Sequence, residues 1–249
     1  MILRRALPLL LLVLAGCADQ SERKARARQD ANEVYDIAAR AFANPDADGR
    51  YPRLDPEAAK SGTGRAATTF YNSIIDDSNG FIDAADEAGM NRILDGEVTS
   101  PSDPVLRKCD DIAALEQLAV RTGKMYPRHF RAFRKALDRE KDIDPDFREG
   151  VLSGFTGAQA RNSDRFALQW RFSEEIVREV AGLCRLLAAG GWSFSNGSYL
   201  FDQPASVTRF NGFADRLTQI SERAMAFQKE QQARTRRGLE AGRKKLETM

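Results

Sequence analysis

The feature that most constrains the fold is a recurrence of apolar residues at intervals of three and four. The pattern is clearest after Phe210, where Arg, Asp, Gln and Glu fill the positions between the apolar ones. This spacing predicts an amphipathic helix with one buried and one solvated face. The apolar positions are Phe210, Phe213, Leu217, Ile220, Ala224 and Phe227.

A second recurrence, from Phe166 to Leu187, has a wider apolar arc. A helix that is apolar over so much of its surface is expected at the centre of a domain. Its stripe contains Phe166, Trp170, Val177, Val180, Cys184 and Leu187, flanked by Leu168, Phe172, Ile176, Leu183 and Leu186.

Further helices are predicted over residues 21–43 and 65–88, each with apolar residues on one side. Capping and first-turn residues indicate three more helix starts. These residues are Ser102 or Asp103 with Pro104, then Pro127, then Pro145. The connecting segments are rich in Gly, Pro and Asp, which favour turns.

Residues 191–202 depart from the helical pattern. Aromatic residues flank Asn196-Gly197, a dipeptide that suits a two-residue hairpin turn because both positions need positive φ. We therefore predict a mainly α fold: a single bundle-like domain of about six to seven helices with one short β-hairpin near residues 192–201.

The chain begins with Arg4 and Arg5, followed by an apolar run from Leu7 to Leu14. This layout is typical of a secretory signal peptide, and the run is far shorter than the roughly 20 residues of a membrane-spanning helix. Residues 1–16 are therefore predicted to be removed. Because Arg4 and Arg5 account for the formal net charge of +2, the remaining chain is electrically balanced. That balance gives no electrostatic reason to expect nucleic acid as a partner.

Leu14, Ala15, Gly16 and Cys17 resemble a bacterial lipobox, in which the cysteine sulfur takes a diacylglycerol before cleavage and the new amino terminus takes a further acyl chain such as palmitate. Each buried methylene contributes about 0.8 kcal/mol, so the resemblance implies stable anchoring to a membrane through Cys17. The alternative is an ordinary secretory signal with an incidental cysteine. Ala18, rather than Asp, follows Cys17, which by resemblance favours the periplasmic leaflet of the outer membrane over the inner membrane.

The mature chain is expected to have three parts: a lipidated N-terminus and polar helix (17–44), a helical domain with the hairpin (45–228), and a polar basic tail (229–249). Basic stretches, SERKARAR and RTRRGLEAGRKK, lie near its two ends. They are interpreted either as solvated helix or disorder, or as contacts for anionic lipid head groups, where each basic residue contributes about 1 kcal/mol.

The layout of the chain is similar to that of the YiaF-like bacterial lipoproteins. The resemblance rests on the signal peptide and lipobox, a mostly helical body of this length, the late Asn196-Gly197 hairpin, and Phe210-Asn211 at the start of a long terminal helix. In sequence it covers residues 190–230. It implies an envelope location and a helical fold, and it implies no particular activity.

Two cysteines remain after Cys17. Cys109 and Cys184 both lie on apolar helix faces. In a chain exported to an oxidising compartment they either pair as a disulfide or stay as separate buried thiols, and both alternatives stay open because a sequence does not supply the Cα separation. Neither cysteine belongs to a Cys-x-x-Cys motif, so redox catalysis is not expected.

Residues that carry catalysis are scarce. His129, in YPRHF, is the only histidine, which excludes paired histidines at a zinc site, and it is interpreted as a surface or groove histidine on a basic helix. Ser153, in GVLSG, lies three positions after the first glycine rather than the two of a nucleophile elbow. We therefore expect no catalytic residue, no cofactor and no enzyme activity.

Residues 44–55, NPDADGRYPRLD, hold the nearest approach to a metal site. Asn44, Asp46, Asp48 and Asp55 fall at positions 1, 3, 5 and 12 of a calcium loop, with glycine at position 6. Prolines at 45, 52 and 56, an Asn in place of the first Asp and a short final ligand favour the alternative, a turn stabilised by an Asx side chain. The acidic stretch 76–87 is interpreted as the solvated face of a helix.

These features together predict a membrane-anchored lipoprotein of the cell envelope that faces the periplasm. Its expected role is non-catalytic, as an envelope interaction or structural protein. The expected partners are the membrane, through Cys17, and other envelope proteins or anionic lipid head groups. The alternative is a helical binding module with an apolar pocket near Trp170 and Trp192 for a lipid or small apolar ligand.

Overall fold

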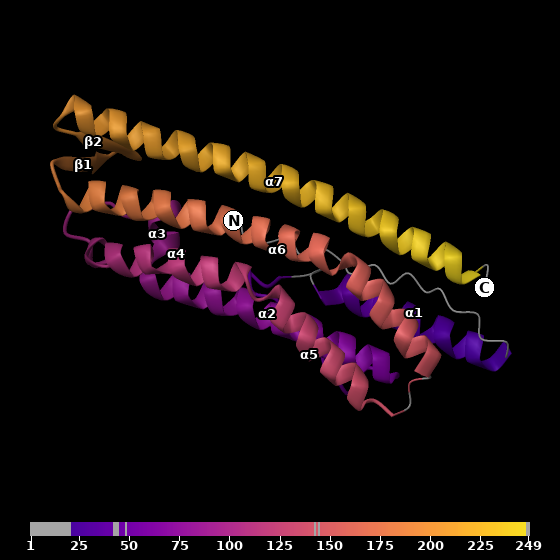
Figure 1. Cartoon of the computed structure of the whole chain (residues 1–249). Helices are drawn as coiled ribbons and strands as arrows, with labels where there is room; N and C mark the ends of the chain where they lie inside the picture. The colour runs from indigo at the N-terminus through magenta and orange to yellow at the C-terminus, as the bar shows by residue number, and fades with distance from the viewer. Residues whose placement is uncertain (1–20, 42–44, 48, 142, 144, 248–249) are drawn as a thin grey trace.

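The computed structural model describes residues 21–41, 45–47, 49–141, 143 and 145–247, which form an elongated helical bundle (Figure 1). The chain is 76% helical, with seven helices and one two-stranded hairpin in the described residues, which confirms the predicted fold class. The elements are α1 (Ser21–Ala41), α2 (Gly62–Ala88), α3 (Met90–Leu94), the 3₁₀ helix η1 (Pro104–Arg107), α4 (Cys109–Gly123), α5 (Tyr126–Arg139), α6 (Pro145–Ala188), β1 (Trp192–Ser195), β2 (Ser198–Phe201) and α7 (Pro204–Glu247).

Both ends of α2 follow from its sequence. The Ser61 side chain accepts a hydrogen bond from the Gly64 backbone N–H at 2.9 Å and so caps the first turn. Gly89 ends the helix with a left-handed φ of 78°. A Cβ at Gly89 would lie 2.3 Å from Cγ2 of Val105, so this position has room only for glycine.

The helix predicted to start at Pro104 is two elements in the structure. Asp103 caps η1 by accepting a hydrogen bond from the Val105 backbone N–H at 3.0 Å. The backbone then changes direction at Lys108, and α4 begins at Cys109. The five-residue helix α3 was not predicted from the apolar pattern.

Helix α6 is the central element, packed against α4, α5, η1 and α7 (Figure 1). The helices expected to start at Pro145 and near Phe166 are one continuous helix. Helix α7 runs antiparallel to α6, and its Phe213 ring fills the space over Gly182, where a Cβ would lie 2.5 Å from the ring. Because α7 continues to Glu247, the segment expected as a tail from residue 229 is its last part.

The segment of residues 49–61 lies along α2 and is fixed by two asparagines. Asn79 accepts a hydrogen bond from the Tyr51 N–H at 2.9 Å and donates one to the Tyr51 carbonyl at 2.8 Å. Asn72 does the same with Leu54, at 2.8 Å in both directions. Each amide thus uses its oxygen as an acceptor and its NH₂ group as a donor toward the backbone of the segment.

The hairpin has the predicted turn. Asn196 and Gly197 both have positive φ, 52° and 76°, and Trp192 pairs with Phe201 at the open end of the antiparallel strands.

Candidate functional site

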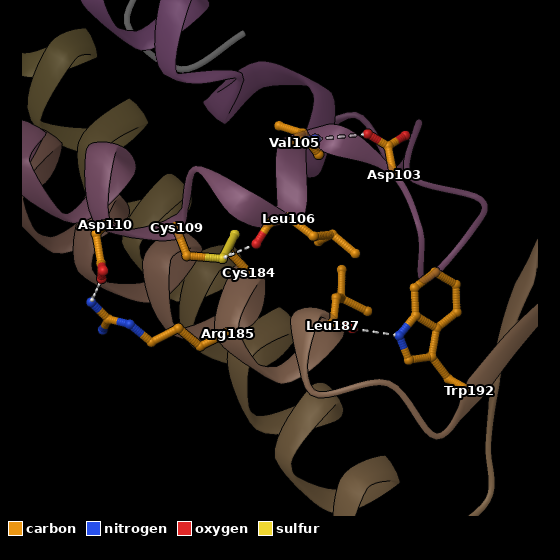
Figure 2. The surroundings of a disulfide bond; sticks show 9 residues. All are labelled: Asp103, Val105, Leu106, Cys109, Asp110, Cys184, Arg185, Leu187 and Trp192. Carbon is orange, nitrogen blue, oxygen red and sulfur yellow. Dashed lines mark hydrogen bonds and ion pairs between the residues drawn. A yellow bond between two sulfur atoms is a disulfide. The ribbon is translucent and has the colours of Figure 1, made fainter.

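A disulfide joins Cys109 at the start of α4 to Cys184 on α6 (Figure 2). The two Cα atoms are 5.5 Å apart, and both side chains are buried. Of the two alternatives left by the sequence, the structure therefore contains the bonded one. The bond connects residues 75 positions apart and so ties η1 and α4 to the central helix.

The surroundings of this disulfide are polar at the surface and apolar inside (Figure 2). Arg185 forms an exposed ion pair with Asp110 at 3.1 Å. On the inner side, the indole N–H of Trp192 donates to the Leu187 carbonyl at 2.7 Å, which satisfies one of the last carbonyls of α6. The Val105 N–H holds the pKa of Asp103 below its usual value.

An aromatic cluster fills the space beside the hairpin. The Tyr199 ring lies 5.2 Å from that of Trp192, 5.1 Å from Phe194 and 5.1 Å from Phe210. Its hydroxyl donates to the Val98 carbonyl at 2.8 Å. Each ring therefore packs on other rings, which is the arrangement of a stabilising cluster.

Trp170, the other residue predicted near an apolar pocket, belongs to a different group of rings. It packs edge-on against Phe81 at 5.2 Å and lies 6.2 Å from Phe166. The two tryptophans thus contribute to two separate aromatic clusters, so the predicted pocket between them has no support from their ring contacts.

His129 corrects the sequence interpretation of a surface or groove histidine. It is buried on α5, and its Nε2 lies 2.7 Å from Oδ2 of Asp77 on α2. The Phe166 ring meets the imidazole edge-on at 6.4 Å. The acidic stretch 76–87 is therefore only partly a solvated face, because Asp77 turns inward.

This pair has the residue types of an acid–base dyad, and sequence reasoning missed it because its members lie 52 positions apart. The histidine side chain is only 8% exposed and the carboxylate 25%. Burial also raises the pKa of the Tyr126 hydroxyl, one turn before His129 on α5, so this phenol stays protonated. The pair is a largely buried polar contact that joins α2 to α5.

The candidate calcium residues do not form a described metal site. Asn44 and Asp48 lie outside the described residues. Asp55 accepts a hydrogen bond from the Glu57 N–H at 2.9 Å, as in an Asx turn, and Asp46 accepts one at 2.8 Å from the N–H of Arg50, four residues further on. Within the described part of the chain, no three His, Cys, Asp or Glu side chains are grouped so that they could hold a metal.

The remaining predicted residues fall in three places. Ser153 is exposed and lies on α6, whereas His129 lies on α5. Cys17 and the predicted signal peptide, residues 1–16, lie outside the described residues. In the basic C-terminal stretch, Arg234 pairs with Glu230 at 2.6 Å and Arg236 with Glu240, so part of its charge is neutralised within α7.

Comparison with family models, with curated proteins and with solved structures finds no match. Among the helices that the structure describes, none has both the length and the apolar character needed to cross a membrane.

Proposed function

We propose that this chain is a lipid-anchored envelope protein that faces the periplasm and acts through its surface, without chemistry of its own. The observation that carries the proposal is the Cys109–Cys184 disulfide. Stable structural disulfides form in oxidising compartments such as the bacterial periplasm and are rare in the cytosol. The bond therefore supports export, which is what the apolar run before Cys17 predicts.

The arrangement of the polar interior supports a non-catalytic role. The buried His129 and the partly buried Asp77 contact each other and join two helices. Asn72 and Asn79 are saturated by backbone groups of the segment 49–61. These polar residues have structural partners in place of a substrate.

The exposed apolar residues indicate which side offers contacts to envelope proteins. The large apolar side chains that the structure describes as exposed lie on α6, β2 and α7, and these are Leu168, Leu200, Val207 and Met225. Helix α7 covers one side of the bundle and packs mainly on α6 (Figure 1). Its outer face is therefore the surface we assign to partner proteins.

The test is the Cys17→Ser variant, with Ala18→Ser as the matched control. Membranes are washed in about 1 M salt, where charges are screened beyond about 3 Å, so that only the acyl anchor retains the protein. We expect wild type and Ala18→Ser in the washed outer-membrane fraction, labelled by palmitate, and Cys17→Ser released. Equal retention of Cys17→Ser would refute the anchor, and cofractionation of wild type with the inner membrane would refute the sorting.

A further inference from the structure

Helix α5 carries one buried apolar face and one exposed basic face. Phe130, Phe133 and Leu137 point into the core, with 2%, 1% and 0% of their surface exposed. Five basic residues share the opposite, exposed side, which we call the α5 basic face: Arg128, Arg131, Arg134, Lys135 and Arg139. Since the apolar face is already used, this helix meets any partner through charge alone.

Among the residues that the structure describes, the α5 basic face has no carboxylate partner of the kind that is common elsewhere in this chain. Arginines at other positions contact Asp or Glu side chains: Arg50, Arg65, Arg92, Arg178, Arg185, Arg216 and Arg223. The structure gives none of the five α5 residues an ion pair with any residue it describes. The one acidic side chain on the same face, Asp138, is exposed and leaves a net charge of +4.

The spacing of these charges suits a flat surface. Arg128, Arg131, Lys135 and Arg139 recur at intervals of three and four, so they form a row of about 16 Å along the helix. Arginine side chains bind phosphate through paired N–H groups, and lysine through its point charge. A row of this kind contacts several phosphates at once.

The end of α5 is connected to α1 through the start of α2. Helix α5 runs toward the end of the bundle at which α1 begins (Figure 1). Glu33 of α1 accepts a hydrogen bond from the Ser61 N–H, and Arg65, one turn into α2, pairs with Glu140 at the end of α5. From Ser21 to Glu33 the helix measures about 18 Å.

We propose that the α5 basic face docks on the anionic phospholipids of the membrane that holds the Cys17 anchor. This inference rests on the proposed function, because only three residues lie between Cys17 and Ser21, a span of at most about 14 Å of chain. Such a short tether keeps the face at a high effective concentration of lipid phosphates, so weak electrostatic contacts are sufficient. Docking lays the bundle on the membrane and leaves α7 outward.

The experiment measures the rate of amine acylation at Lys135 in the full-length acylated protein, reconstituted in vesicles. One set is phosphatidylcholine alone, and the other contains about one third phosphatidylglycerol. Lys229 on α7 serves as the internal reference, since it is exposed and lies on another helix. We expect Lys135 to react several-fold more slowly on the anionic vesicles, and Lys229 to react equally on both.

Matched variants assign the protection to α5. The Arg131→Gln/Arg134→Gln variant loses two charges with little change in helix propensity. Each charge contributes about fivefold to the constant for docking on the membrane, so this constant should fall roughly 25-fold and the protection of Lys135 should be lost. Arg107→Gln/Arg209→Gln removes two exposed charges on other elements, η1 and α7, and should keep protection. Raising salt to about 1 M should also abolish it while the protein stays on the vesicles.

Several results would overturn the inference: equal Lys135 rates on both vesicles, protection that survives in the α5 variant, or equal loss in the control variant. Protection that requires added envelope proteins would assign the face to an acidic protein instead. If the N-terminal peptide carries no acyl chain, the proposed function fails separately. In that case co-flotation of the wild-type and α5-variant chains with anionic vesicles decides the α5 inference alone.

Discussion

Removing the Cys109–Cys184 bond is expected to lower the free energy of unfolding by about 4 to 5 kcal/mol. The bond joins residues 75 positions apart. In the chain-entropy relation, a loop of that length gives about 4.5 kcal/mol at 25 °C, because the cross-link removes many conformations from the unfolded chain. The folded state loses little, since both cysteines lie in the apolar core.

The assay is thermal unfolding followed by circular dichroism, on protein refolded with and without a reductant. For a chain of this size, each kcal/mol lowers the melting temperature by about 2 to 4 °C, so the expected decrease is about 9 to 18 °C. The Cys109→Ala/Cys184→Ala variant should melt near the reduced wild type and should not respond to the reductant. A decrease below about 3 °C, or free thiols at both positions in the unreduced protein, would refute the reasoning.

Four further substitutions test the packing. His129→Ala should lower the free energy of unfolding by about 1 to 3 kcal/mol, because Asp77 loses its partner in a partly buried site; an unchanged urea midpoint would show that the pair adds no stability. Gly80→Ala should stabilise by about 0.5 to 1 kcal/mol, since a Cβ there meets nothing within 4 Å. Gly89→Ala should destabilise by more than about 1 kcal/mol because of its positive φ. If both glycine variants shifted the melting temperature in the same direction, these two expectations would be contradicted. Phe213→Ala should cost less than the roughly 3 to 5 kcal/mol of a fully buried phenylalanine, because this ring is half-buried, and loss of a cooperative melt would contradict that.

Local patterns were sufficient to predict most of the elements. The apolar spacing after Phe210 predicted the buried side of α7, because helical periodicity reports burial directly. Asn196-Gly197 predicted the hairpin turn, since few other dipeptides adopt positive φ twice. The pattern did not predict α3, because five residues span little more than one turn and give no periodicity.

The polar pairs could not be predicted in the same way. Asp77 and His129 meet only because α2 and α5 pack together, and the chain between them carries no signal of that contact. A cysteine pair poses the same difficulty, since its bonding depends on a distance set by the packing of α4 against α6. The α5 basic face did have a local signal, the spacing of its Arg and Lys residues at three and four. That no described carboxylate pairs with this face became visible only in the structure.

The asparagines that hold the segment 49–61 set a fixed length for that part of the chain. Asn72 and Asn79 are seven residues apart, about 10.5 Å along the axis of α2, and Tyr51 and Leu54 are three residues apart, about 10 Å of extended chain. Two turns of helix and three extended residues thus have nearly the same length. Each asparagine amide can therefore bond both the N–H and the C=O of one residue in the segment. An insertion or deletion between Tyr51 and Leu54 shifts the register by about 3.3 Å and leaves one amide facing no complementary groups. This stretch is therefore intolerant of length change even though it has no regular secondary structure.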